Sequence, residues 1–201
     1  MAVYSYIITR DYGFAPNPFY GVCTLATCKP KIRKSAQVGD WVVGFGSSTG
    51  KFKNKIIYAM KVEDKLTFDT YWDDTKYHRK KPVANGSLKQ NFGDNIYHHL
   101  NGDWVQENSH HSNDDGTINE YNLKRDTQAD CVLISSTYWY FGKKAIDTPP
   151  NLTGIIPYGR GYRIFKGFDE QLLEWLDSLG EKGYIGEPAK FDKFERYDGI
   201  H

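Results

Sequence analysis

Short apolar and aromatic runs alternate with polar turns along most of this chain, a pattern that is typical of a β-rich domain. Runs at residues 3–9, 40–46 and 56–62 are rich in β-branched and aromatic residues, and each is bounded by turn residues. Residues 131–141 add one long strand or a bent pair of strands. This spacing predicts a mixed or antiparallel curved sheet that closes toward a barrel.

Helical patterns are fewer. Residues 169–179 predict the clearest helix, with Asp169 as the N-cap and Gly180 at its end. Its apolar stripe consists of Leu172, Leu173, Leu176 and Leu179. Residues 67–74 predict a shorter helix. The expected fold class is therefore α+β, with a few helices flanking the sheet.

Residues 84–129 have a different character, because apolar residues are sparse and turn signals follow one another. Asn85-Gly86, Asn101-Gly102 and Asp115-Gly116 are three of these signals. They predict a long irregular insertion, a candidate lid, within a single domain that spans residues 1–201.

The segment from Arg10 to Lys31 is a long loop rich in Pro, Asn, Gly and aromatic residues. Ordering such a loop costs conformational entropy, so it seldom serves only as a connection. Its mixture of rings, amides and cations suits a flat, polar, phosphate-bearing ligand, which predicts a nucleotide or nucleic acid. The expected contacts are Arg10, Tyr12, Phe14, Asn17, Phe19, Thr24, Lys29, Lys31, Arg33 and, from a later glycine-flanked loop, Arg160.

Two residues of this segment are candidates for catalysis, and each has a simpler interpretation. Asp11 either caps the loop or pairs with Arg10, or it acts as a general base. Cys23 is either a small buried residue at a loop-to-strand junction or a nucleophile activated by nearby cations. Cys28 and Cys131 are expected to be buried.

Other motifs are interpreted without chemistry. The stretch from Gly44 to Lys51 lacks the glycine spacing of a phosphate-binding P-loop, and Phe52 replaces the required hydroxyl. The pairs His98-His99 and His110-His111 lack helical metal-ligand spacing and are expected to be solvated. No metal and no cofactor are therefore predicted.

Composition limits the remaining possibilities. The net charge is +1 over 201 residues, which excludes a polycation but permits a local basic face. The three cysteines match neither a zinc ribbon nor a redox pair, which favours a reducing compartment. No long apolar run and no signal-peptide pattern are present, so we expect a cytoplasmic protein without a membrane span.

The N-terminal motifs resemble a known family. Residues 10–18, 21–30 and 38–42 are similar to the second of the "nucleotide modification associated domain" families, and residues 136–142 and 158–161 are similar to its later blocks. This family occurs in phage and bacterial gene neighbourhoods for DNA base modification. The turn at Gly39-Asp40 also resembles PUA-like modified-base readers, the EVE and YTH domains, which hold an extruded base in an aromatic pocket.

Three functions are consistent with these patterns. The leading hypothesis is a nucleic-acid-binding domain that recognises a modified or flipped base in DNA modification or phage defence. The second is an enzyme acting on a DNA base or nucleotide through Asp11 or Cys23. The third is a sensor of a small soluble nucleotide. Partner proteins of a modification system are a further expectation.

Overall fold

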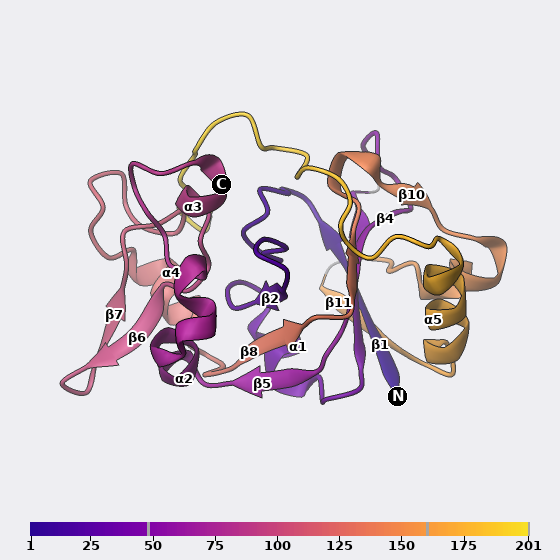
Figure 1. Ribbon diagram of the computed structural model, residues 1–201, viewed down its shortest axis with the longest axis horizontal. Helices are drawn as coiled ribbons and strands as arrows, with labels where there is room; N and C mark the ends of the chain where they lie inside the picture. Colours follow the sequence, from indigo (N-terminus) through magenta and orange to yellow (C-terminus); the bar gives the residue numbers. More distant parts are fainter. Residues whose placement is uncertain (48, 160, 201) are drawn as a thin grey trace.

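The computed structural model describes residues 1–47, 49–159 and 161–200, and it is built around a seven-stranded mixed sheet (Figure 1). Strand order is β11-β1-β3-β4-β9-β12, and β10 pairs with β4. The strands are β1 (Ala2–Ile8), β3 (Trp41–Gly46), β4 (Lys55–Lys61), β9 (Tyr138–Tyr140), β10 (Ile146–Asp147), β11 (Tyr162–Lys166) and β12 (Gly183–Tyr184). β1 runs parallel to β3, and β12 runs parallel to β9, whereas the other pairs are antiparallel.

Alternation along β1 divides the core between the two faces of this sheet. Val3 contributes to a cluster that packs against helix α5 (Asp169–Ser178), through Leu172 and Leu176. Tyr4 and Tyr6 point to the opposite face, toward the second sheet and helix α1 (Pro30–Ser35). Successive side chains of a strand point to opposite faces, so one strand supplies both clusters.

A second sheet and a helical region complete the fold on the side away from α5. The second sheet has the order β2-β8-β5, from β2 (Cys23–Leu25), β8 (Val132–Ser135) and β5 (Asp64–Leu66). Beyond it lie α2 (Phe68–Asp73), α3 (Leu88–Asn91), α4 (Glu120–Asp126) and the hairpin of β6 (Tyr97–Leu100) and β7 (Asp103–Gln106) (Figure 1). The 3-10 helices are η1 (Thr75–Lys80), η2 (Gly142–Lys144) and η3 (Pro150–Ile155).

The α+β class and most predicted elements are confirmed. The strands at 3–9, 40–46 and 56–62 form within about one residue of the expected bounds. The run at 131–141 is two strands in different sheets, because the chain bends at Ser136-Thr137. In the described part of the chain, no pairing joins the edge strands β11 and β12, so the sheet is open and the expected closure toward a barrel is not found.

Both predicted helices form, with one correction at a helix start. The N-cap of α5 is Phe168, and Asp169 lies in the first turn, where its carboxylate favours the positive end of the helix dipole. The predicted end at Gly180 is confirmed, since this glycine has φ +79°, a left-handed conformation.

The segment 84–129 is more regular than the sequence predicts. It contains α3, the β6–β7 hairpin and α4, and its Asn101-Gly102 dipeptide is the hairpin turn, with φ values of 53° and 92°. Apolar residues are sparse in it, but Phe92, Ile96 and Tyr97 are buried in a cluster with Phe14. A small number of large apolar side chains is therefore enough to anchor this region to the core.

The last part of the chain, residues 185–200, crosses the molecule from the α5 side to the α3–α4 side, and we call it the C-terminal strap (Figure 1). Backbone hydrogen bonds hold it at both ends of its path: Lys190 N donates to Asp11 O over 2.7 Å, and Tyr197 N donates to His110 O over 2.7 Å. The strap thereby joins the N-terminal loop to the segment that carries His110.

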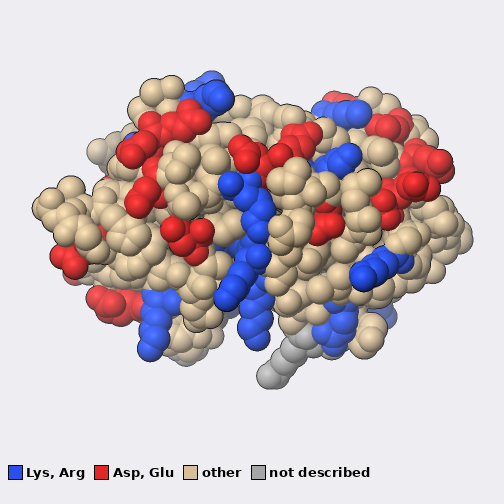
Figure 2. Space-filling view, turned by 90° about the horizontal axis from the view of Figure 1, so that it is seen from below, with Lys and Arg blue, Asp and Glu red and all other residues tan. Residues whose placement is uncertain are grey.

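Charge is distributed unevenly despite the small net value. Figure 2 shows a band of Lys and Arg side chains across the middle of one face, with Asp and Glu mostly on either side. This distribution agrees with the expectation of a local basic face on a nearly neutral protein. None of the helices in the described ranges is both long and apolar enough to cross a membrane.

Candidate active site

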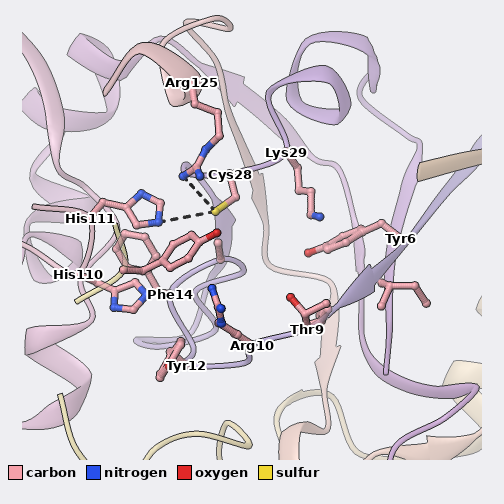
Figure 3. A pocket seen from close by; sticks show the side chains of 14 residues that line it. Tyr6, Thr9, Arg10, Tyr12, Phe14, Cys28, Lys29, His110, His111 and Arg125 are labelled. Carbon is pink, nitrogen blue, oxygen red and sulfur yellow. Dashed lines mark hydrogen bonds between the residues drawn. The ribbon is translucent and has the colours of Figure 1, made fainter. Parts of the chain in front are cut away.

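An open cavity of about 220 Å³ lies where the N-terminal loop meets the α4 region and the strap. Its walls come from the end of β1 with the loop that follows, from the turn before α1, from the loop between β7 and α4, from α4 and from the strap (Figure 3). The polar and aromatic lining residues are Tyr6, Thr9, Arg10, Tyr12, Phe14, Cys28, Lys29, His110, His111, Arg125 and Tyr197. Five separate segments of the chain therefore build this one cavity.

Cys28 and His111 lie on one wall of the cavity, and Asp126 lies behind His111. Cys28 Sγ lies 3.8 Å from His111 Nε2, and His111 Nδ1 lies 2.9 Å from Asp126 Oδ2. His111 and Asp126 are buried, with 1% and 0% of their surfaces exposed, whereas Cys28 is half-buried and faces the cavity. A thiol beside an imidazole, which a buried carboxylate orients, is the arrangement of an activated cysteine nucleophile.

The charges of this triad favour a thiolate–imidazolium pair. Burial by itself raises the pKa of the Cys28 thiol, but His111 and Arg125 outweigh it and lower that pKa below the ordinary value. Burial likewise opposes a charged His111, but Asp126 and Cys28 raise the pKa of its imidazole. Against the effect of burial, His111 and two arginines hold the pKa of Asp126 far below its usual range. All three shifts favour the charged forms, which is the electrostatic environment of an activated cysteine.

The backbone places Cys28 in a strained turn. Cys28 has φ 55° and Lys29 has φ 41°, so two consecutive non-glycine residues are left-handed between β2 and α1. Such residues cost on the order of 1–3 kcal/mol each and persist only where the surroundings hold them. Asp126 Oδ1 accepts a hydrogen bond from Cys28 N over 3.0 Å, and Arg33 Nε donates to Cys28 O over 2.9 Å. Asp126 therefore orients both the His111 imidazole and the backbone of Cys28.

Aromatic rings form much of the remaining wall. Phe14 contacts both histidines, with its ring centroid 4.9 Å from that of His110 and 4.6 Å from that of His111. The Tyr197 ring lies beside both histidines, and Arg10 lies over it, with Cζ 4.7 Å from the ring centroid. Flat, weakly polar walls with cations at their edges suit a planar heterocycle.

Four of the predicted ligand contacts meet in this cavity: Arg10, Tyr12, Phe14 and Lys29 all line it. Lys31 is exposed on α1 and is not among the lining residues. Arg160 lies outside the described residues. The long N-terminal loop thus lines a cavity, through fewer residues than its composition predicts.

Arg33 is a correction to the predicted phosphate contacts. It is fully buried, and its guanidinium donates to the carbonyl oxygens of Cys28, Ala129, Cys131 and Asp126. With these donors engaged inside the protein, Arg33 holds the Cys28 turn and does not reach a ligand.

Asn17, Thr24 and Phe19 are also internal. Asn17 Oδ1 accepts from Lys80 Nζ over 2.8 Å, and Thr24 Oγ1 donates to Asp94 Oδ2 over 2.7 Å. Phe19 is buried in the aromatic cluster. Lys80, in the basic stretch of residues 76–81, is buried among these groups, and this burial lowers the pKa of its amine to about 8. A buried polar network needs every partner satisfied, which explains so many polar residues in the loop.

The two predicted catalytic residues lie outside the cavity. Cys23 is fully buried in the core, and burial raises the pKa of its thiol to about 12. The Asp11 side chain accepts hydrogen bonds from the Tyr140 hydroxyl and from Ala189 N, and burial raises the pKa of its carboxyl. The burial of Cys23 fits its simpler interpretation, a core thiol. Asp11 instead anchors the strap through Ala189 N, a role that the sequence did not indicate.

The expected solvation of the histidine pairs is also wrong, because His98 is buried and so is the pair His110-His111. Sequence analysis missed this pair together with Cys28, Arg125 and Asp126. One local signal was present: Cys28 and Lys29 directly precede Pro30, a residue favoured in the first turn of a helix, and a strand precedes them. Cys28 and His111 are 83 positions apart in the sequence, and no local pattern signals their proximity.

Burial in this pocket makes His110 sensitive to acid. Burial lowers the pKa of its imidazole to about 3, and the neutral ring donates its Nδ1 proton to the Glu195 carbonyl. Because the unfolded chain binds this proton near pH 6.5 and the folded protein does not, acidification favours unfolding. We expect wild type to lose about 2 kcal/mol more unfolding free energy between pH 7 and pH 5 than His110→Phe. Urea titrations at the two pH values measure this difference, and equal losses would contradict a neutral buried His110.

The same three groups could hold a metal ion, because one ligand atom each of Cys28, His111 and Asp126 lie within 4.8 Å of one another. Two features oppose a cation there. Arg125 Nη2 lies 3.8 Å from Cys28 Sγ, and Asp126 is occupied by His111 Nδ1 and Cys28 N. A guanidinium beside the sulfur stabilises a thiolate and repels a metal ion.

Comparison with known proteins gives a family but no annotated relative. No curated protein and no solved structure matches the chain significantly. The model of the family described as nucleotide modification associated domain 2 matches residues 1–195, which include the Cys28–His111–Asp126 triad. The match confirms the resemblance of the N-terminal motifs, and the chain therefore belongs to the nucleotide modification associated domain 2 family.

Proposed function

We propose that this protein is an enzyme of nucleotide modification, in which the Cys28 thiolate attacks an electrophilic carbon of a nucleotide or of a base in DNA. The observation that carries the proposal is the alignment of Cys28, His111 and Asp126 beside an open cavity. Family membership supplies the nucleotide context, and the triad supplies the type of chemistry.

The first chemical step is an addition. A bond forms between Cys28 Sγ and a carbon that is doubly bonded to oxygen or nitrogen. The electron pair of the opened π bond moves to that oxygen or nitrogen, which takes the Nε2 proton of the His111 imidazolium. The proton then returns to His111, and the electron pair re-forms the double bond to the carbon. This step expels either a leaving group or the thiolate from that carbon. Asp126 keeps the imidazole oriented and charged until the transfer.

A second candidate is the binding function that the sequence favoured, recognition of a modified or flipped base. The aromatic walls of the cavity support it, because Tyr6, Tyr12, Phe14 and Tyr197 surround a space open to solvent. In that case Cys28 would contact the ligand without reacting. The kinship with PUA-like readers, a role as a soluble-nucleotide sensor, the phage-defence setting, partner proteins and a cytoplasmic location also remain predictions.

Selective labelling of the thiols tests the enzymatic proposal. We expect Cys28 to react with iodoacetamide at pH 6–7, where half-buried Cys131 and fully buried Cys23 stay unmodified, because burial raises the pKa of both other thiols. Peptide mass spectrometry identifies the alkylated residue. If the alkylation rate of Cys28 instead rises with pH as that of an ordinary thiol does, Cys28 is not an activated nucleophile.

Two additional measurements separate the alternatives. Incubation with nucleotide mixtures and with DNA, followed by nucleoside mass spectrometry, should give a product that Cys28→Ser does not make. A chelator should leave the labelling rate unchanged, whereas a metal bound to Cys28 would protect the thiol until the chelator removed it. Ligand binding that is unaltered in Cys28→Ser, together with no product in wild type, would favour the reader.

A further inference from the structure

The cavity carries more positive charge than the triad requires. Arg10, Lys29 and Arg125 line it, and its lining residues, all within the described ranges, include no Asp or Glu. Asp126 lies behind His111 and is engaged by it, by Cys28 N and by Arg125 Nε, so part of the Arg125 charge is already paired. Arg10 and Lys29 have no carboxylate among the lining residues, and their charges favour an anionic ligand.

The two arginines approach the same ring. Arg10 Cζ lies 4.7 Å from the Tyr197 ring centroid, and Arg125 Cζ lies 5.9 Å from it. Figure 3 shows their side chains entering the cavity from opposite sides, with Cys28 beside Arg125. Arg10 is exposed and makes no salt bridge within the described residues, so its donors remain available to a ligand.

Arg125 divides its donors between the protein and the cavity. Its Nε donates to Asp126 Oδ1 over 3.1 Å, which fixes the plane of the guanidinium, and its Nη2 points toward Cys28 Sγ. Lys29 closes a third side, with Nζ 4.6 Å from the Tyr6 ring centroid, and burial lowers the pKa of its amine. The cations are therefore held in place by neighbouring groups before any ligand arrives.

We infer that Arg10 and Arg125 form a phosphate subsite beside Cys28, so that the substrate presents a phosphate group to the cavity. This inference rests on the proposed function, because it names the substrate class of the same site. The planar guanidinium fork matches phosphate oxygens in two-point contacts, and the adjoining rings accept the base. The phosphate belongs either to a free mononucleotide or to a nucleic-acid backbone, and both sources present the same oxygens.

Protection of Cys28 from alkylation tests the subsite. Inorganic phosphate should slow the reaction of Cys28 with neutral iodoacetamide, and Arg10→Gln should weaken this protection about tenfold. Lys31→Gln is the matched control, because it removes one exposed positive charge of α1 outside the cavity and should leave protection unchanged. The ratio of rates with anionic iodoacetate and neutral iodoacetamide should fall in Arg10→Gln and not in Lys31→Gln.

Calorimetry on Cys28→Ser separates this inference from the proposed function, since binding does not require a reactive thiol. A nucleoside monophosphate should bind more tightly than its nucleoside. The affinity of an oligonucleotide, measured in the same way, identifies the source of the phosphate. Tighter binding of the mononucleotide indicates a free nucleotide, and tighter binding of the oligonucleotide indicates a backbone. Equal affinity for nucleoside and monophosphate, with no protection by phosphate, would overturn the subsite even if Cys28 proves to be an activated nucleophile.

Discussion

Replacing Asp126 by asparagine is expected to slow alkylation of Cys28 at pH 7 by about 10- to 100-fold, because each lost pKa unit is about 1.4 kcal/mol of thiolate stabilisation. Asp126 raises the pKa of His111, and His111 in turn lowers that of Cys28, an effect that exceeds the direct repulsion between the Asp126 carboxylate and a Cys28 thiolate. Without the carboxylate, the imidazole becomes neutral and the thiol keeps its proton. Stopped-time alkylation with peptide mass spectrometry gives the rate.

The pH dependence of this rate shows whether the substitution acts through the pKa of the Cys28 thiol. A lowered thiol pKa makes the wild-type advantage large near neutrality, and the advantage must vanish at high pH, where the thiol ionises in either protein. Glu120→Gln removes one exposed carboxylate from the same helix, α4, and should leave the rate unchanged. Equal rates for wild type and Asp126→Asn at pH 7, in a folded variant, would show that the triad does not activate Cys28.

Arg33→Ala is expected to be among the most destabilising single substitutions in this protein, with a loss of at least about 4 kcal/mol of unfolding free energy. Its guanidinium satisfies four main-chain carbonyls, and removal leaves these buried acceptors unpaired. Because Cys28 O is one of the four, the strained turn at Cys28 also loses its support. Urea unfolding followed by tryptophan fluorescence measures the loss.

Two companion variants keep this second prediction testable if Arg33→Ala does not fold. Arg33→Lys retains the charge but cannot reach four carbonyls with one ammonium group, so it should fold with intermediate stability and slower Cys28 alkylation. Lys31→Ala, two residues away on the exposed side of α1, should change stability by no more than about 0.5 kcal/mol. Wild-type stability of Arg33→Lys would contradict the role of Arg33 as the clamp of this turn.

Several of the ligand contacts predicted for the N-terminal loop are wrong, and for one physical reason. Its polar residues were interpreted as ligand contacts, and several instead satisfy one another: Lys80 reaches Asn17, and Thr24 reaches Asp94. From sequence, a buried polar network and a binding surface look alike, because both need polar side chains beside aromatic rings. Burial alone distinguishes them, and burial is a property of the folded chain.

The cysteines show the same limit. Cys23 and Cys28 are five residues apart in one loop-to-helix segment, yet burial raises the pKa of the first thiol to about 12, and a histidine 83 residues away lowers that of the second. The sequence analysis chose Cys23 as the candidate nucleophile, although Cys28 lies directly beside Lys29. The deciding neighbours, His111, Arg125 and Asp126, come from a segment that was expected to be irregular.

The chain by itself determined the periodic elements, the α+β class and the family, because these depend on alternation of side chains along strands, on helical stripes and on local motifs. It also predicted that Arg10, Tyr12, Phe14 and Lys29 lie together, and all four line one cavity. Only the tertiary structure decided which thiol lies beside an imidazole and a guanidinium, and which cations share a cavity. Activation and charge clustering depend on distances between groups far apart in sequence, and no local pattern records those distances.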